Sequence, residues 1–340
     1  AMLPGRARAE WASGAYDLVL ENLCKLLFFS QIYLPSAPRL GLVHHLFGLS
    51  AFRQVSAPIA SYVVATEALL PILYRRCPMI AVSPSTRDDL VRRGLRRDRV
   101  RVIPNGLDHR VFRPAGVART DPDLVLFVGR LEHYKGVDVL LEAWPRVRAE
   151  RPAARLVLAG AGGAEQELRA RAAALGLGDS VQFAGFVSEE AKVEWMQRAS
   201  LVVQPSRKEG WGLTVLEANA CGTPVVAARV PGLRDSVRHD ETGWLVEGGQ
   251  SEALAQGLLR ILSDRVLRER LGRGAVLWAQ RFGWDEVTAS FAACVRAAAR
   301  REPLPETPDW LAASAVPFGQ GGGAAAPLAA REAWEGRARS

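Results

Sequence analysis

Short apolar runs alternate with helical stretches along most of the chain. In the first third, runs at 16–20, 40–44, 79–83 and 99–103 predict strands, and stretches at about 58–74 and 86–94 predict helices. Ser85 or Thr86 is the expected N-cap of the second helix. From residue 124 on, strands are expected at 124–128, 155–159, 180–183, 201–204 and 224–227, and helices at 136–148, 164–175, 188–198, 214–221 and 251–262. Strands that alternate with helices predict the α/β class, with parallel sheets.

The alternation of strands and helices is interrupted at residues 113–123, which are rich in Pro, Gly and Asp. We therefore expect a partial first domain at 1–112, a linker at 113–123 and a complete, doubly wound second domain at 124–283. A helix is expected at 284–300. Residues 301–340 contain several prolines and a glycine-rich run, so we expect a disordered tail. The length of 340 residues agrees with two domains.

The composition narrows the function classes. The chain is 49% hydrophobic and 24% charged, which is typical of a soluble globular protein and argues against a fibre. Its net charge of +8 favours an anionic partner, such as a phosphate, a phospholipid surface or nucleic acid. Only four of its 44 basic residues are lysines. An arginine-rich stretch at 87–101 is interleaved with aspartates, which indicates a solvated face or a contact with anionic lipid; it lacks the aromatic residues of a nucleic-acid site.

The cysteines and the apolar stretches bear on the cellular compartment of the protein. Cys24, Cys77, Cys221 and Cys294 are scattered, which favours reduced thiols over a disulfide or zinc framework. No signal peptide is evident at the start, and the longest apolar stretch, 57–74, is interrupted by Pro58, Glu67 and Pro71. We expect a cytoplasmic protein, with peripheral contact to the inner face of a membrane as an option.

The most informative segment runs from residue 205 to 224. A strand ends at Gln204, a glycine-containing loop follows, and a helix opens near Leu213. The free N–H groups of a first helical turn and the helix dipole favour a phosphate. Glu209 and Glu217 bracket this site, and a carboxylate can accept two O–H groups of a sugar diol. A phosphate site between two such carboxylates describes a nucleotide sugar, although by spacing alone these residues could be an ordinary surface glutamate and a helix former.

A second segment follows the strand at 124–128. The strand ends at Gly129, and Arg130 and Lys135 flank the turn before the next helix. In a doubly wound domain the carboxyl ends of strands face the ligand crevice. Two cations there would neutralise a diphosphate leaving group; the plain alternative is a solvated loop.

These motifs carry a resemblance. Residues 129–136, the segment Val102–Asp108, and the stretch from Glu209 through Glu217 to Pro224 resemble the retaining glycosyltransferases of family 4, also called glycosyl transferases group 1, over about residues 16–299. The resemblance implies the GT-B fold, in which two Rossmann-like domains face a cleft and a helix, here 284–300, packs back across to the first domain. Family members usually open with a strand and a glycine-rich loop. Nothing before Tyr16 resembles it, so we expect an incomplete first domain that lacks about 100 residues.

The resemblance also implies roles for single residues. Arg130 and Lys135 correspond to a diphosphate clamp next to Gly129, Glu217 to the ribose-binding carboxylate and Glu209 to the carboxylate that faces the transferred sugar. His44, with His45 as alternate, corresponds to the histidine that faces this sugar. The expected phosphate-binding amides belong to Gly210, Trp211, Gly212, Leu213 and Thr214, and the expected base-contacting turn contains Phe186 and Val187. The resemblance implies no metal or other cofactor, and the Asp-Pro-Asp of 121–123 is expected to be linker.

The expected reaction moves a hexose from a UDP- or GDP-sugar to a hydroxyl of a glycan, lipid or small-molecule acceptor, with retention of anomeric configuration. Two alternatives stay open. One is a nucleotide-sugar-binding module without turnover, which the missing opening motivates. The other is a GT-B epimerase or phosphorylase. A basic nucleic-acid binder is a distant third.

Overall fold

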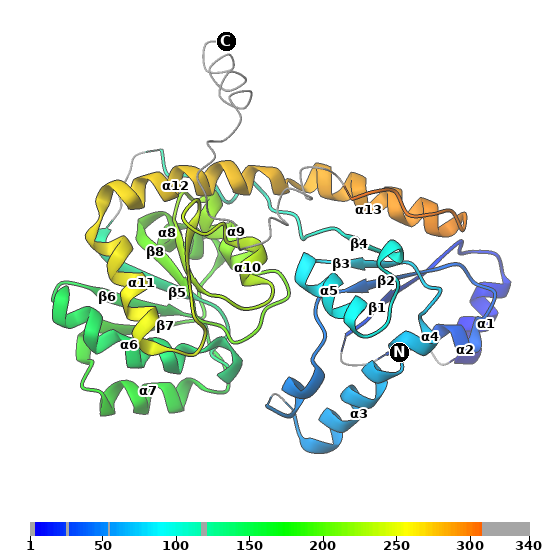
Figure 1. Ribbon diagram of the computed structural model, residues 1–340, viewed down its shortest axis with the longest axis horizontal. Helices are drawn as coiled ribbons and strands as arrows, with labels where there is room; N and C mark the ends of the chain where they lie inside the picture. Colours follow the sequence, from blue (N-terminus) through cyan, green and yellow to red (C-terminus); the bar gives the residue numbers. More distant parts are fainter. Residues whose placement is uncertain (1–3, 25–26, 54, 117–120, 308–340) are drawn as a thin grey trace, which may run out of the picture.

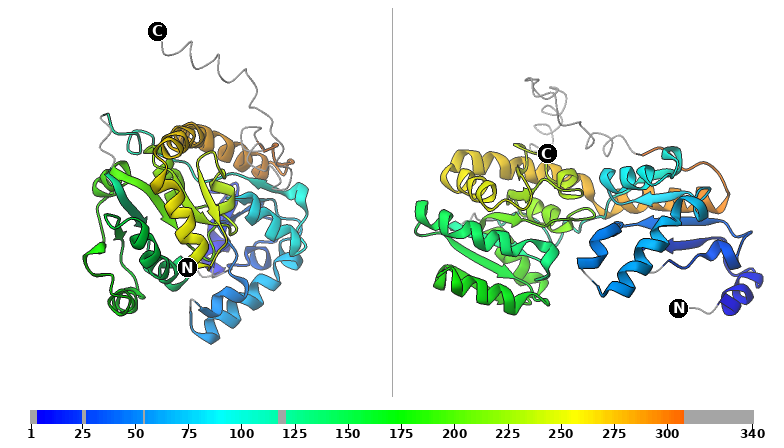
Figure 2. Two further views of the ribbon diagram at one scale, coloured as in Figure 1. Left: turned by 60° about the vertical axis from the view of Figure 1, so that its left-hand side comes forward. Right: turned by 60° about the horizontal axis from the view of Figure 1, so that its bottom comes forward.

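The computed structural model describes residues 4–24, 27–53, 55–116 and 121–307. Two α/β domains lie side by side, each built on one parallel sheet (Figures 1 and 2). This is the α/β architecture with two sheets that the sequence predicts. Most of the tail predicted to be disordered lies outside the described residues.

The N-terminal domain contains the four strands expected from its sequence. They are β1 (Val19–Asn22), β2 (Arg39–Val43), β3 (Met79–Ala81) and β4 (Val100–Val102), paired in parallel in the order β1-β2-β3-β4. Its helices are α1 (Pro4–Ala12), α2 (Ser30–Tyr33), α3 (Ala57–Ala68), α4 (Leu70–Leu73) and α5 (Pro84–Arg92). The predicted N-cap of α5 was wrong. Ser83 caps the helix, its Oγ accepting from the Thr86 N–H at 3.1 Å, because Pro84 lacks an N–H and takes the first helical position.

The C-terminal domain has a six-stranded parallel sheet in the order β10-β9-β8-β5-β6-β7. Its strands are β5 (Asp121–Val128), β6 (Arg155–Ala159), β7 (Val181–Gly185), β8 (Ala199–Gln204), β9 (Val225–Ala228) and β10 (Gly243–Val246). Its helices are α6 (Val137–Glu150), α7 (Glu165–Ala174), α8 (Glu189–Arg198), α9 (Leu213–Ala220), α10 (Leu233–Ser236), α11 (Ser251–Ser263) and α12 (Arg265–Ala279). β10, α10 and α12 were not predicted from the sequence.

The predicted linker at 113–123 was too long at its C-terminal end. β5 already begins at Asp121, three residues earlier than expected. Asp121 pairs with Arg155, and Asp123 pairs with Arg151 at 2.5 Å. These ion pairs neutralise two residues that are unfavourable in strands, so the Asp-Pro-Asp segment starts a strand.

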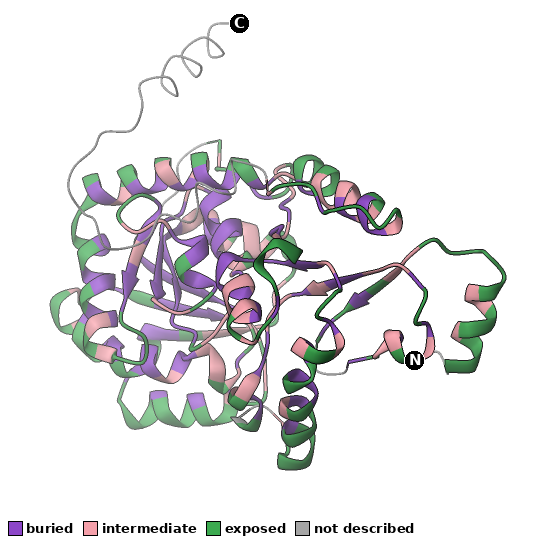
Figure 3. Cartoon of the chain, turned by 45° about the vertical axis from the view of Figure 1, so that its right-hand side comes forward, coloured by how far each residue is buried: buried purple, intermediate pink, exposed green. Residues whose placement is uncertain are grey.

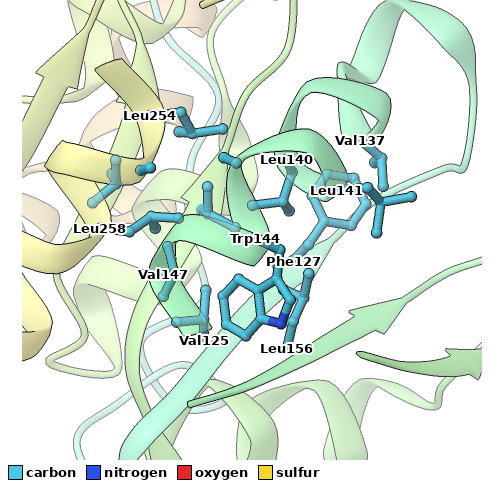
Figure 4. Close-up of a cluster of buried hydrophobic side chains, with 14 of the residues drawn as sticks. Val125, Phe127, Val137, Leu140, Leu141, Trp144, Val147, Leu156, Leu254 and Leu258 are labelled. Carbon is cyan, nitrogen blue, oxygen red and sulfur yellow. The ribbon is translucent and has the colours of Figure 1, made fainter. Parts of the chain in front are cut away.

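The core of the C-terminal domain lies on both faces of its sheet. Successive side chains of β5 alternate, with Val125 and Phe127 on the face covered by α6 and α11, and Leu124, Leu126 and Val128 on the other. Trp144 of α6 is fully buried among the side chains between the sheet and the helices α6 and α11 (Figure 4). Its Nε1 donates to the Ser180 Oγ at 3.2 Å. Burial on both faces explains why the strands read as continuous apolar runs.

The last helix joins the domains. α13 (Trp284–Ala299) continues from α12 and lies along the N-terminal sheet (Figure 1), where Val287, Cys294 and Ala297 pack against Leu40 and Ile80. This is the crossing predicted for residues 284–300. Past it, Leu304 is buried, and Arg101 donates to the Leu304 and Pro305 carbonyls at 3.0 and 2.6 Å. The segment 301–307 was predicted to be disordered, but it packs on the N-terminal domain because arginine donors and an apolar pocket hold it.

Candidate functional site

The strand order of the C-terminal sheet brings the two predicted loops together. From β5 the chain moves outward through β6 and β7, and from β8 it moves the other way through β9 and β10. β5 and β8 therefore meet where the direction reverses, and ligands of doubly wound sheets bind beyond the carboxyl ends of the strands at this point. The loop 129–136 follows β5 and the loop 205–212 follows β8.

Direct contacts join these two loops. The Lys135 Nζ lies 2.6 Å from the Glu209 Oε1, which also accepts from the Ser206 Oγ at 2.8 Å. Both partners are mostly buried, with 14% and 16% of their side chains exposed. The Arg207 N–H donates to the Tyr134 carbonyl at 2.7 Å. The Glu209 side chain is thus held in a fixed place beside the Lys135 ammonium.

A small cavity lies between the domains at this point. Its volume is about 90 Å3, and it is lined by His45, Phe47, Arg130, Tyr134, Lys208, Glu209 and Gly210. The Arg130 guanidinium donates to the Tyr134 hydroxyl at 2.7 Å. Pockets for small molecules usually measure about 300–1,000 Å3, so the two walls of this cavity are close together.

The α9 helix presents its N-terminus at the same edge. Its N-cap is Gly212, with φ +83° and no side-chain cap, and its first turn contains no acidic residue. The first N–H groups of a helix have no intrahelical partner, and the dipole adds partial positive charge. This terminus can therefore bind an anion. Trp211 is buried edge-on against Phe282, with ring centroids 5.4 Å apart, so its backbone is the part that could face a ligand.

The second predicted carboxylate lies further along α9. Glu217 is largely buried, and its Oε1 accepts from the Lys192 Nζ at 3.0 Å. Burial raises the pKa of Glu217, and the Lys192 ammonium opposes this shift. Glu217 does not line the small cavity. Phe186, in the turn after β7, is 88% exposed, whereas Val187 packs against the core.

The predicted histidines follow β2 and face the C-terminal domain. A Cβ atom on Gly210 would lie 2.4 Å from the His44 carbonyl oxygen, so only glycine allows this approach. The same carbonyl accepts from the Thr86 Oγ1 at 3.3 Å. Burial lowers the pKa of His44, which keeps its ring neutral at pH 7. His45 lines the cavity and His44 does not, so the residue predicted as alternate is nearer the cavity.

Sequence reasoning missed several contacts between the domains. The Lys208 Nζ donates to the Leu46 carbonyl and, at 3.4 Å, to the Phe47 carbonyl. Asp235 accepts from the Ser85 N–H at 3.0 Å, and the Arg234 Nε donates to the Ser85 Oγ at 3.1 Å. A signal for Lys208 existed, because lysine is rare in a chain that otherwise uses arginine. Two of the other three lysines, Lys135 and Lys192, pair with the predicted site carboxylates Glu209 and Glu217 within the C-terminal domain.

Other predicted surfaces and sites have simpler outcomes. In the stretch 87–101, Asp88, Asp89 and Asp98 pair with arginines, which favours the solvated face. Within the described residues, no group of three or more His, Cys, Asp or Glu side chains could hold a metal ion. No helix in the described ranges is long and apolar enough to cross a membrane.

Comparisons with known proteins agree on the family and the fold. The model of Glycosyltransferase Family 4 matches residues 2–111, and that of Glycosyl transferases group 1 matches residues 108–278. D-inositol 3-phosphate glycosyltransferase of Acidothermus cellulolyticus is 41% identical over 209 residues, which are 56% of this chain and 46% of the relative. The enzyme of the same name from Xylanimonas cellulosilytica is 38% identical over 243 residues, 66% of this chain and 58% of the relative. The chain thus spans about half the length of these curated relatives.

Two solved structures resemble the chain over most of its length. Sucrose-phosphate synthase of Thermosynechococcus elongatus has a TM-score of 0.74 and 28% identity, covering 86% of this chain and 76% of that one. Anabaena HepE, solved in complex with UDP and glucose, has a TM-score of 0.72 and 24% identity, covering 86% and 81%. The second likeness concerns the fold alone. The chain belongs to the glycosyl transferases group 1 family, and its fold is GT-B.

Proposed function

We propose that this chain transfers a hexose from a UDP- or GDP-sugar to an acceptor hydroxyl, with retention of configuration at the anomeric carbon. The observation that carries the proposal is the Lys135–Glu209 pair at the reversal point of the C-terminal sheet. In this proposal Lys135 would bind the diphosphate, and Glu209, directly beside it, would accept hydrogen bonds from sugar hydroxyls. Membership of the family supports the same reaction type.

The diphosphate would lie between two kinds of positive groups. Arg130 and Lys135 approach from the loop after β5, beside Gly129, and the amides of Gly210, Trp211, Gly212, Leu213 and Thr214 approach from the start of α9. Negative charge builds on the diphosphate as the bond to the sugar breaks, and fixed cations and dipoles stabilise that charge without reorganising. The Lys135 side chain would swing from Glu209 to the diphosphate. The Glu209 carboxylate would then be free to accept hydrogen bonds from hexose hydroxyls.

The rest of the donor would extend from this centre. Glu217 would accept the two ribose hydroxyls, with Lys192 keeping its carboxylate ionised against burial. The exposed ring of Phe186 would contact the base, with Val187 supporting the turn. His44, neutral and at the end of β2, would face the hexose through its backbone or ring and stabilise positive charge at the sugar.

The small cavity implies that the domains separate to admit the donor. A volume of about 90 Å3 is too small for a nucleotide sugar. Separation would break the contacts of Lys208 and of Gly210 with the loop after β2. Their re-formation would exclude water from the reacting centre, which favours transfer over hydrolysis.

The names of the relatives suggest an acceptor class. Proteins 38–41% identical to this chain are named D-inositol 3-phosphate glycosyltransferases. We therefore include a phosphorylated cyclic polyol, presented as a small-molecule acceptor, among the first candidates to assay.

The test is a thermal-shift panel of UDP-, GDP- and ADP-sugars. At about 100 times its Kd a ligand stabilises by about 2.7 kcal/mol. For 340 residues, with an unfolding entropy of about 2.1 cal/mol/K per residue, this corresponds to roughly 4 °C. One nucleotide should shift the wild type, and the shift should shrink in Arg130→Ala and Glu217→Ala but not in the surface control Arg110→Ala. Equal shifts in all four proteins would remove the site assignment. A shift without release of nucleoside diphosphate would favour the binding module.

A further inference from the structure

Glu67 is a buried carboxylate in an unfavourable place. It lies in the last turn of α3, where the helix dipole disfavours negative charge, and only 2% of the residue is exposed. Figure 3 shows α3 with one side exposed and the other buried. A buried charge is costly unless it is paired and hydrogen-bonded. The partners of Glu67 are therefore informative about its role.

The partners lie in the loop that follows His44 and His45. The Phe47 N–H donates to the Glu67 Oε1 at 2.6 Å, and the Gly48 N–H donates to the Oε2 at 2.8 Å. The guanidinium of Arg93, the C-cap residue of α5, donates to the Oε2 at 3.1 Å and neutralises the charge. The two carboxylate oxygens thus each hold one peptide group of this loop.

The carbonyls of these same two peptide groups face the other domain. The Leu46 carbonyl belongs to the peptide whose N–H is that of Phe47, and the Phe47 carbonyl belongs to the peptide of the Gly48 N–H. Both peptides are trans, so each carbonyl points away from its N–H. Both carbonyls accept from the Lys208 ammonium of the C-terminal domain. Two aligned peptide dipoles thus connect the Glu67 carboxylate to the Lys208 cation.

We propose that Glu67 is a positioning residue: through these two peptides it holds the Leu46 and Phe47 carbonyls where Lys208 docks when the domains close. The role in turnover rests on the proposed function. Phe47 and Lys208 both line the small cavity beside Glu209, so the position of this loop sets the N-terminal wall of the cavity. Glu67 itself is too deeply buried to touch a donor.

The first test needs no ligand. Amide hydrogen exchange of the 44–48 loop in the full chain should be at least 10-fold faster in Glu67→Ala than in the wild type. Glu67→Gln, which keeps one acceptor oxygen in the same volume, should fall between them. The matched control is Glu21→Gln, since Glu21 is also buried in the N-terminal domain and accepts from the Ser30 N–H at 2.9 Å. It should leave the 44–48 loop unchanged.

The second test compares free UDP or GDP with the sugar donor. Binding of the free nucleotide should stay within twofold in Glu67→Gln, while kcat with the donor falls at least 10-fold. The kcat of Lys208→Met should fall by a similar factor. The double variant, Glu67→Gln with Lys208→Met, should lose little more kcat than either single variant.

The outcomes separate this proposal from the proposed function. Unchanged exchange of the 44–48 loop in both Glu67 variants would overturn the proposal, as would additive losses in the double variant. If Glu67→Ala does not fold, the hydrogen exchange and kcat of Glu67→Gln decide whether the proposal holds. A wild type that binds no nucleotide would refute the proposed function, and the exchange experiment would still decide the role of Glu67.

Discussion

Replacing Gly210 by alanine should prevent the two domains from closing fully. A Cβ atom at this position would lie 2.4 Å from the His44 carbonyl oxygen and 3.2 Å from its carbon. Contacts of a real Cβ are essentially never shorter than 3.0 Å, so the two backbones must separate by about 0.6 Å at least.

Both backbones are held on their own sides. The His44 carbonyl follows β2 and accepts from the Thr86 Oγ1, and the Glu209 N–H, next to Gly210, donates to the Pro231 carbonyl at 3.3 Å. We therefore expect the separation to come from a movement of the two domains apart. A misplacement near 1 Å around a reacting centre costs roughly 100-fold in rate. We expect kcat of Gly210→Ala to fall by about that factor, while the affinity for free UDP or GDP, which the C-terminal domain alone would bind, changes less than twofold.

The assay is release of nucleoside diphosphate, paired with calorimetric titration of the free nucleotide. Gly116→Ala is the matched control, because a Cβ there meets nothing within 4 Å, and its kcat should equal that of the wild type. A Gly210→Ala enzyme with normal kcat would refute the idea that the reaction uses this closed arrangement. A loss of nucleotide affinity as large as the loss of kcat would refute the idea that the C-terminal domain alone binds the nucleotide.

Three further changes test other parts of the structure. Trp144→Ala should lower the free energy of unfolding in urea by about 3–5 kcal/mol, the usual cost of removing a buried tryptophan, whereas Leu277→Ala, at an exposed position, should change it little. Lys135→Met should weaken binding of UDP or GDP in calorimetry by about 10- to 100-fold, since a charge-assisted hydrogen bond contributes about 1.5–3 kcal/mol; an unchanged Kd would contradict the clamp. Because burial lowers the pKa of His44 below 6.5, the unfolded chain binds more protons under acidic conditions and stability falls as the pH drops through this range. His44→Gln should reduce that fall between about pH 8 and pH 5.5 in urea unfolding, and an identical pH dependence would contradict the burial of the ring.

The fold of the C-terminal domain is predictable where strands are buried on both faces. The runs at 124–128 and 201–204 are continuous and apolar, and they became β5 and β8. The start of β5 was missed because Asp121 and Asp123 have turn chemistry by themselves. Their arginine partners, at 155 and 151, lie about 30 residues away, and no local pattern predicts that pairing.

The candidate site was predictable only within each loop. Arg130, Lys135, Glu209 and the start of α9 are local signals after strands. That Lys135 pairs with Glu209, 74 residues away, depends on the sheet order. Glu67 read as an interruption of an apolar stretch, because its partners belong to a loop and a helix that the chain brings together only in three dimensions.

The use of lysine supports the importance of geometry at this site. Arginine fills most basic positions of the chain, yet Lys135, Lys192 and Lys208 all occupy tight, largely buried contacts. A guanidinium is planar and carries its donors in a fixed fork, whereas an ammonium is compact and directs three donors from one point. In the proposed site Lys135 would turn about such a point from the Glu209 carboxylate to a phosphate. Lys208 donates to two successive carbonyls. Charge alone would be equally well served by arginine, so the shape of these contacts is what requires lysine.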